Sequence, residues 1–195
     1  QLAVLMDGEK VVDQPLVDLN LEVTSGMYKD DNLSQLFALR IKDPKRWWPR
    51  GYGDPNLYEL EVQLRRGEKL QDSTQLVLGL RTIELERGDS EDKEGNFRFR
   101  VIGQPIFVRC AEMVPADFFL PRAQAYEGYI LKALAEGRNN MVRLTAAGGY
   151  GSDGLYDYCD RNGILVWQDL PFSEAMYPDG NAIRQRIQAE LGVQV

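Results

Sequence analysis

The sequence contains no histidine and only two cysteines, Cys110 and Cys159. Without histidine, a Ser-His-Asp triad and imidazole metal ligands are excluded. Two cysteines far apart in sequence are too few for a disulfide framework or a zinc site. Both are therefore expected to be buried thiols that form no disulfide, and no metal site is predicted.

An excess of positive charge is also missing. The chain has 23 lysines and arginines against 30 aspartates and glutamates, a net charge of −7. This balance argues against nucleic-acid binding, which needs clustered lysine and arginine. No apolar stretch reaches the roughly 20 residues of a membrane-spanning helix, so no membrane partner is expected. The first ten residues do not resemble a signal peptide, and the compartment stays unknown.

The first half of the chain has the alternating pattern of β-strands. Asp7–Gly8 is a strong hairpin signal. Apolar and polar residues alternate over 16–23, 36–42 and 58–64. Such alternation indicates sheets with one buried face, and several short strands separated by turns indicate a β-sandwich. Trp47 and Trp48 are expected to pack into its core, and the polar segment 84–96 is expected to be a linker.

From about residue 97 the hydrophobic period changes. Strand patterns over 106–110, 139–145 and 164–169 alternate with helical patterns over 126–137, 152–162 and 180–191. Strands that alternate with helices predict parallel βα units. A small open α/β sheet would give the same pattern, so the residues alone leave that alternative open. The change of period divides the chain into one domain over 1–96 and another over 97–195.

Four stretches cover nearly the whole chain in a specific order. They are WWPRGYGDPNLYELEVQL (47–64), GLRTIEL (79–85), GQPIFVRCAEMVPADFFLPR (103–122) and the segment 142–179. Together they resemble family 2 glycoside hydrolases, in particular the β-mannosidase branch. The resemblance implies a multi-domain α+β fold: an immunoglobulin-like β-sandwich over 1–96, followed over 97–195 by the first three βα units of a TIM (β/α)8 barrel. It also implies a retaining glycoside hydrolase acting on β-linked sugars, with β-mannosides as the favoured substrate.

The resemblance gives a role to residues at the strand ends. In a TIM barrel the carboxyl ends of the strands form the active-site rim. Three charged residues would lie there: Asp169 ends the third strand, Arg143 ends the second, and Glu112 follows the first. The family keeps an arginine at the position of Arg143, near the nucleophilic carboxylate, and a guanidinium fork suits such a place. In an ordinary α/β domain Glu112 and Asp169 would merely be exposed to solvent, and that alternative stays open.

Rim positions depart from the β-mannosidase pattern, whereas scaffold positions match it. Cys110–Met113 replaces Gly-Ala-Asn-Trp, Thr145 replaces a tryptophan that helps to wall the sugar subsite, and Leu170–Ser173 replaces Phe-Met-Phe-Ala. Either the substrate differs or the site has decayed. The predicted substrate-binding residues are Arg143, Asp169, Glu112 and Thr145.

No catalytic residue is predicted in this chain. Retaining glycosidases use two carboxylates roughly 5 Å apart. In the family these glutamates follow the fourth and seventh barrel strands, to which nothing here corresponds. Asp169 and Glu174 could lie close together on a loop, but nothing in the family supports that pair. The chain alone is therefore expected to be inactive, and no cofactor is implied because carboxylate chemistry needs none.

The chain is expected to be a central piece of a larger enzyme. A three-unit part of a barrel leaves open strand edges and an uncovered apolar face. We expect self-association, or missing parts of the parent protein, to cover them, and a carbohydrate to be the ligand. The alternative is a non-catalytic sugar-binding or assembly module from a decayed or truncated family member.

Overall fold

The structure is a computed structural model that describes residues 2–6, 9–14, 41–66, 68–88, 97–117, 119–173 and 175–194. The predicted strand over 16–23, most of that over 36–42, and Glu174 lie outside the described residues. The chain divides into two compact units. Unit 1 comprises Gln1–Val108 with Asp160–Ile164, and unit 2 comprises Arg109–Cys159 with Leu165–Val195. The domain border predicted at residue 96 falls beside an undescribed stretch and stays a prediction.

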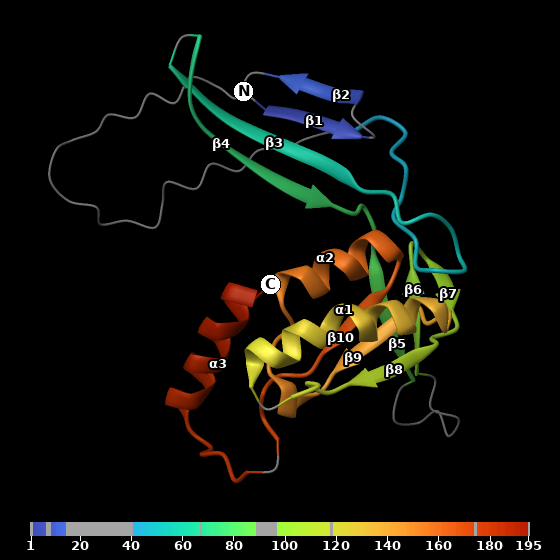
Figure 1. Cartoon of the computed structure of the whole chain (residues 1–195), viewed down its shortest axis with the longest axis vertical. Coiled ribbons are helices and arrows are strands. Elements are labelled where there is room, and N and C mark those ends of the chain that lie inside the picture. Colours follow the sequence, from blue (N-terminus) through green and yellow to red (C-terminus); the bar gives the residue numbers. More distant parts are fainter. Residues whose placement is uncertain are drawn as a thin grey trace, which may run out of the picture. The chain divides into compact units, whose positions relative to one another are not determined.

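Unit 1 contains a four-stranded antiparallel sheet in the order β2-β1-β3-β4 (Figure 1). Its strands are β1 (Leu2–Met6), β2 (Glu9–Gln14), β3 (Tyr58–Arg66) and β4 (Lys69–Leu78). β1 and β2 pair antiparallel on either side of Asp7–Gly8, as the hairpin signal predicts. The alternation over 58–64 becomes β3, in which Tyr58 is buried.

A second antiparallel sheet in unit 1 has the order β5-β6-β7, formed by β5 (Ile83–Arg87), β6 (Phe97–Val101) and β7 (Gln104–Ile106). The prediction of a linker is therefore wrong for residues 84–87. Opposite charges across the strands explain the pairing: the Glu86 carboxylate accepts hydrogen bonds from the Nε atoms of Arg98 and Arg100. The hydrogen bonds from Arg100 and then Arg98 lower the pKa of Glu86. The charged residues 84–87 can therefore form a strand, because arginines on the neighbouring strand pair with Glu86.

Trp47 lies in the core of unit 1, as predicted, and is fully buried. Its indole Nε1 donates a hydrogen bond of 2.7 Å to the carbonyl oxygen of Asp160. The Arg81 guanidinium carbon lies 4.2 Å from the ring centroid, a cation–π distance. Gly79 leaves room for the ring, because a Cβ there would come within 2.9 Å of it. Trp48 is only half-buried.

Unit 2 is built on a parallel three-stranded sheet in the order β10-β9-β8. The strands are β8 (Cys110–Met113), β9 (Met141–Leu144) and β10 (Leu165–Gln168). The helices are α1 (Leu120–Glu136), α2 (Asp153–Asn162, whose last three residues belong to unit 1), α3 (Asn181–Gln194) and the 3₁₀ turn η1 (Ala146–Gly148). The predicted parallel βα units are confirmed. No helix of the described chain is long and apolar enough to span a membrane.

The boundaries of these elements differ from the predictions in two places. The first strand begins at Cys110 instead of ending there, so Cys110 is exposed while Cys159 is buried as expected. The helix predicted over 126–137 begins six residues earlier, at Leu120, with a proline in its first turn. The ends of α2 carry the residue types that favour them: Ser152 Oγ accepts a hydrogen bond from the Leu155 amide, and Gly163 follows the helix with a φ of 66°.

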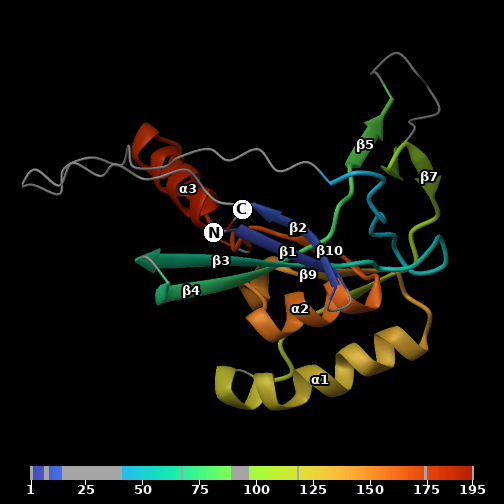
Figure 2. The same cartoon turned by 90° about the horizontal axis from the view of Figure 1, so that it is seen from above.

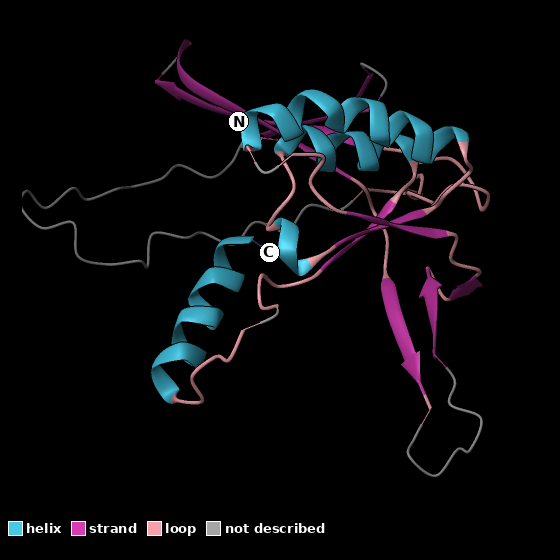
Figure 3. Ribbon diagram, turned by 60° about the horizontal axis from the view of Figure 1, so that its bottom comes forward, coloured by secondary structure: helices cyan, strands magenta, loops and turns pink. Residues whose placement is uncertain are grey.

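One face of the unit 2 sheet is covered by α1 and α2, which lie side by side (Figures 2 and 3). The buried apolar residues between this face and the helices include Leu131 and Leu134 of α1, Leu155 and Cys159 of α2, and Val142 and Leu144 of β9. Asn140 is buried too, and its side-chain oxygen accepts a hydrogen bond of 2.7 Å from the Arg109 amide. The side chains on the opposite face of this sheet are not covered by α1 and α2, and the candidate site lies among them.

Candidate functional site

Strand register brings the predicted charged residues together in unit 2. Glu112 of β8 lies beside Arg143 of β9, and Arg143 lies beside Trp167 of β10. Because side chains alternate along a strand, Asp169 projects to the same face as Trp167. The four side chains therefore share the sheet face opposite α1 and α2. We call Glu112, Arg143, Trp167 and Asp169 the Arg143 cluster.

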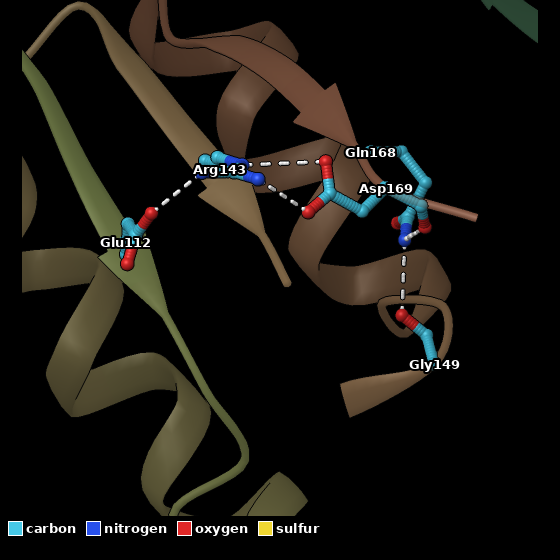
Figure 4. Close-up of polar contacts among 5 residues, drawn as sticks. All are labelled: Glu112, Arg143, Gly149, Gln168 and Asp169. Atoms are coloured by element: carbon cyan, nitrogen blue, oxygen red, sulfur yellow. Dashed lines mark hydrogen bonds and ion pairs between the residues drawn. The ribbon is translucent and has the colours of Figure 1, made fainter. Parts of the chain in front are cut away.

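The Arg143 guanidinium is held by both carboxylates (Figure 4). Its Nε donates a hydrogen bond to Asp169 Oδ1 at 3.2 Å, and its Nη2 donates one to Asp169 Oδ2 at 2.8 Å, which makes a two-pronged pair. Nη1 donates to Glu112 Oε1 at 2.7 Å. The guanidinium carbon also lies 5.6 Å from the centroid of the Trp167 ring. A planar fork bound at three nitrogens has one orientation, so the Arg143 guanidinium holds its own positive charge at a fixed place within the cluster.

The electrostatics of the cluster follow from these contacts. Hydrogen bonding and attraction to Asp169, with a smaller contribution from Glu112, raise the pKa of Arg143. The side chains of Glu112, Arg143 and Asp169 are 62%, 40% and 20% exposed. Ion pairs this accessible contribute only about 0–1 kcal/mol each to stability. The cluster therefore serves orientation more than stability, and two carboxylates around one guanidinium leave it with a net charge of −1.

Thr145 does not join the cluster through any polar contact in the described part of the chain. It directly follows β9, and its amide donates a hydrogen bond of 3.3 Å to the Met113 carbonyl oxygen. Its hydroxyl oxygen is buried, with no hydrogen-bond partner among the described residues. Thr145 lines a cavity of about 70 Å³ together with Glu127 of α1 and Ser152. Of the four predicted substrate-binding residues, three are joined by hydrogen bonds, and Thr145 makes no polar contact with them in the described part of the chain.

One member of the cluster, Trp167, and one residue behind it, Gln168, were not among the predicted site residues. Trp167 was assigned only to a buried strand, yet it is 37% exposed and stacks near Arg143. Its spacing of two from Asp169 was the signal that could have found it. Gln168 binds the loop after β9, and its donor contact to the Gly149 carbonyl oxygen is 3.0 Å long. Sequence offered no signal for that contact, because it depends on the path of the loop.

Comparison with known proteins gives the family. The model of the glycosyl hydrolases family 2 matches residues 5–81. Beta-mannosidase B of Neosartorya fischeri is 38% identical over 153 residues, covering 77% of this chain and 18% of that protein. The chain belongs to glycosyl hydrolase family 2. The family predicted from the sequence motifs is thus confirmed.

Further members of the family support the match along the chain. Beta-mannosidase A of Aspergillus aculeatus is 30% identical, over 96% of this chain and 20% of that protein. The crystal structure of the beta-D-mannosidase from Dictyoglomus thermophilum superposes with a TM-score of 0.76 at 31% identity, covering 97% of this chain and 22% of that chain. The chain therefore spans about a fifth of the length of these relatives. Among the described residues no group of three or more His, Cys, Asp or Glu could hold a metal ion.

Proposed function

We propose that this chain supplies part of the substrate-binding rim of a retaining glycoside hydrolase that acts on β-linked sugars, with β-mannosides as the favoured substrate. The observation that carries the proposal is the Arg143 fork, held by Asp169 and Glu112 where three parallel strands end. The carboxyl ends of parallel strands are where barrel enzymes bind substrate. The β-mannosidase relatives support the choice of sugar.

The chemistry of the cluster suits a polyol. The contacts to Asp169 and Glu112 use three of the five N–H donors of Arg143, which leaves two for a sugar oxygen or a further carboxylate. Carboxylate oxygens of Glu112 and Asp169 accept hydrogen bonds from sugar hydroxyls. In a retaining mechanism one carboxylate attacks the anomeric carbon and a second acts as acid and then base. A fixed guanidinium near the nucleophile keeps that carboxylate ionised.

The proposal extends to the domains. The antiparallel sheets of unit 1 would form an immunoglobulin-like sandwich over 1–96, and the βα units of unit 2 would be the first three of a TIM barrel over 97–195. In the sheet order that the structure describes, β8 and β10 are the outer strands. An eight-stranded barrel closes by pairing such strands, so a further part of the protein or a second copy would cover them.

Hydrolysis of 4-nitrophenyl β-mannoside tests this function. We expect no turnover by the 195-residue chain, because neither carboxylate of a catalytic pair is assigned within it. A polypeptide of the relatives' length that carries this sequence should hydrolyse the β-mannoside with retention of anomeric configuration, followed by proton NMR, and should leave the α-mannoside intact.

Three results would contradict parts of this account. Turnover by the pure 195-residue chain would refute its inactivity, and inversion of configuration would refute the retaining mechanism. If the longer polypeptide cleaves no β-glycoside, the alternative of a non-catalytic sugar-binding or assembly module is the better description. That alternative draws on Thr145, which stands where the family pattern has a tryptophan and whose hydroxyl makes no polar contact with the cluster in the described residues.

A further inference from the structure

The last residue of β10, Gln168, uses its whole amide group on the side of the sheet that faces away from the Arg143 cluster. We infer that Gln168, together with Tyr156, is a positioning residue: it fixes Asp169 and, through Asp169, the orientation of Arg143. The inference rests on the proposed function only in so far as Arg143 faces substrate. Its structural part stands on contacts within unit 2.

The contacts of Gln168 join three separate segments. Oε1 accepts a hydrogen bond of 2.9 Å from the Tyr156 hydroxyl of α2. Nε2 donates to the Gly149 carbonyl oxygen at 3.0 Å and to the Asp169 carbonyl oxygen at 2.7 Å (Figure 4). A primary amide has two N–H donors and one carbonyl acceptor, so each polar atom of Gln168 is engaged.

Tyr156 attaches the same loop at a second point. Besides donating to Gln168, its hydroxyl accepts a hydrogen bond of 3.1 Å from the Gly151 amide. The loop between β9 and α2 is thus held at Gly149 and at Gly151 by one pair of side chains. Gly149 turns the chain there with a φ of 69°, a conformation that favours glycine. Because this loop begins directly after Leu144, the pair holds the chain next to Arg143.

The backbone of Asp169 is fixed on both sides. Its amide donates a hydrogen bond of 3.0 Å to the Leu144 carbonyl oxygen of β9, and its carbonyl oxygen accepts one from Gln168. Gln168 and Asp169 are consecutive, so they project to opposite faces. The amide therefore anchors the strand end from behind, while the carboxylate binds Arg143 in front. This arrangement explains why an apolar strand ends on Gln-Asp.

The consequence is functional because a two-pronged arginine–carboxylate pair tolerates little displacement. Catalytic groups need to be held within about 0.5 Å by residues whose own positions are locked. If the amide donors of Gln168 are lost, the Asp169 carbonyl oxygen and the Gly149 loop lose their common anchor. The carboxylate of Asp169 can then rotate, and Arg143 loses its single orientation.

Arginine NMR on the ¹⁵N-labelled 195-residue chain tests the inference without any substrate. The readout is the hydrogen-exchange rate of the Arg143 Nε proton, which donates to Asp169. In Gln168→Glu an oxygen that only accepts hydrogen bonds replaces the Nε2 donor to the carbonyl oxygens of Gly149 and Asp169. We expect this substitution to raise the exchange rate of the Arg143 Nε proton about tenfold. Tyr156→Phe should raise it about threefold, and Asp169→Asn gives the rate with the ion pair lost.

Tyr150→Phe is the matched control. Tyr150 lies on the same loop, but its hydroxyl donates a hydrogen bond of 2.6 Å to Glu190 of α3. This hydrogen bond raises the pKa of Tyr150 to about 12. Its loss should leave the Arg143 exchange rate within twofold, even where Tm falls as far as in Tyr156→Phe. The inference is overturned if Tyr156→Phe and Tyr150→Phe change the rate equally, or if neither Tyr156→Phe nor Gln168→Glu changes it. Should Gln168→Glu fail to fold, the two tyrosine variants decide alone.

Failure of the inference and failure of the proposed function are separable. In a catalytically active polypeptide of the relatives' length, Gln168→Glu should lower kcat/KM about tenfold and should add nothing to Asp169→Asn, because both act through one carboxylate. A full additional loss in the double variant refutes action through Asp169. If exchange at Arg143 responds as expected but no variant or parent cleaves a glycoside, the positioning role stands and the proposed hydrolase function falls.

Discussion

Replacing Arg143 with alanine is expected to lower kcat/KM for a β-mannoside about 10²- to 10³-fold in a polypeptide of the relatives' length that carries this sequence. The side chain holds two carboxylates through three nitrogens, so its loss leaves Asp169 and Glu112 repelling one another with no cation between them. Lysine keeps the charge but cannot make the two-pronged pair with Asp169, so Arg143→Lys should recover less than a tenth of the lost activity. Steady-state kinetics on purified variants measures both effects.

Arg184 offers a matched control for the Arg143 variants. It also pairs with a carboxylate, that of Asp179 at 3.0 Å, but it is not a member of the Arg143 cluster and both side chains are largely exposed. Arg184→Ala should leave kcat/KM within twofold. The urea midpoint of Arg143→Ala should move little, because accessible ion pairs contribute only about 0–1 kcal/mol. An Arg143→Ala variant with near-parental activity would remove the cluster from the substrate site.

Replacing Trp47 with alanine is expected to reduce the free energy of unfolding by about 3–5 kcal/mol. The ring is fully buried, and the substitution removes both its packing and the indole donor to the Asp160 carbonyl oxygen. Trp47→Phe keeps most of the apolar surface but leaves that carbonyl without the donor, so a loss of about 1–3 kcal/mol is expected. Urea denaturation followed by circular dichroism gives both values.

Trp167 is the comparison for Trp47 in stability. Its ring is 37% exposed, and the Arg143 guanidinium carbon lies 5.6 Å from the ring centroid. Trp167→Ala should therefore cost about 1 kcal/mol, well below the cost at Trp47. A loss of only about 1 kcal/mol at both positions would contradict the expected contribution of Trp47 to a packed core.

Part of the Arg143 cluster could be predicted from the sequence. Alternation and the rim rule predicted Arg143 and Asp169 together, because period and strand direction are local properties. Glu112 joined them through register, although the strand that carries it starts four residues later than expected. Trp167 was missed because a continuous apolar run has no visible period, so its exposed side could not be told from its buried side.

The wrong or missing predictions have one physical cause: the structure of these residues depends on contacts with residues far away in the sequence. Glu86 looks like a linker residue until Arg98 and Arg100 stand across from it. Tyr156 was placed on the correct helix, but its hydroxyl acts on Gln168 and Gly151, neither of which helical spacing can indicate. Cys110 was expected to be buried, yet it begins β8, an outer strand of the described sheet, and is exposed.

The departure of the rim from the β-mannosidase pattern bears on the substrate. Thr145 stands where the family pattern has a tryptophan, and its buried hydroxyl has no hydrogen-bond partner among the described residues. Glu112 adds an acid that is 62% exposed beside Arg143. Under the proposed function, we expect the net negative charge of the cluster to disfavour sugars that carry a carboxylate, because like charges repel at close range. The proposed preference for a neutral hexose such as mannose agrees with this charge balance.

The crystal structure of a polypeptide of the relatives' length, carrying this sequence and a bound β-mannoside-configured inhibitor, tests the central claim most directly. The account predicts the sugar at the Arg143 cluster, with a hydroxyl within hydrogen-bond distance of Glu112 or Asp169 and with the Arg143 fork still on Asp169. An inhibitor bound elsewhere, with no sugar atom in contact with Glu112, Arg143 or Asp169, would contradict it.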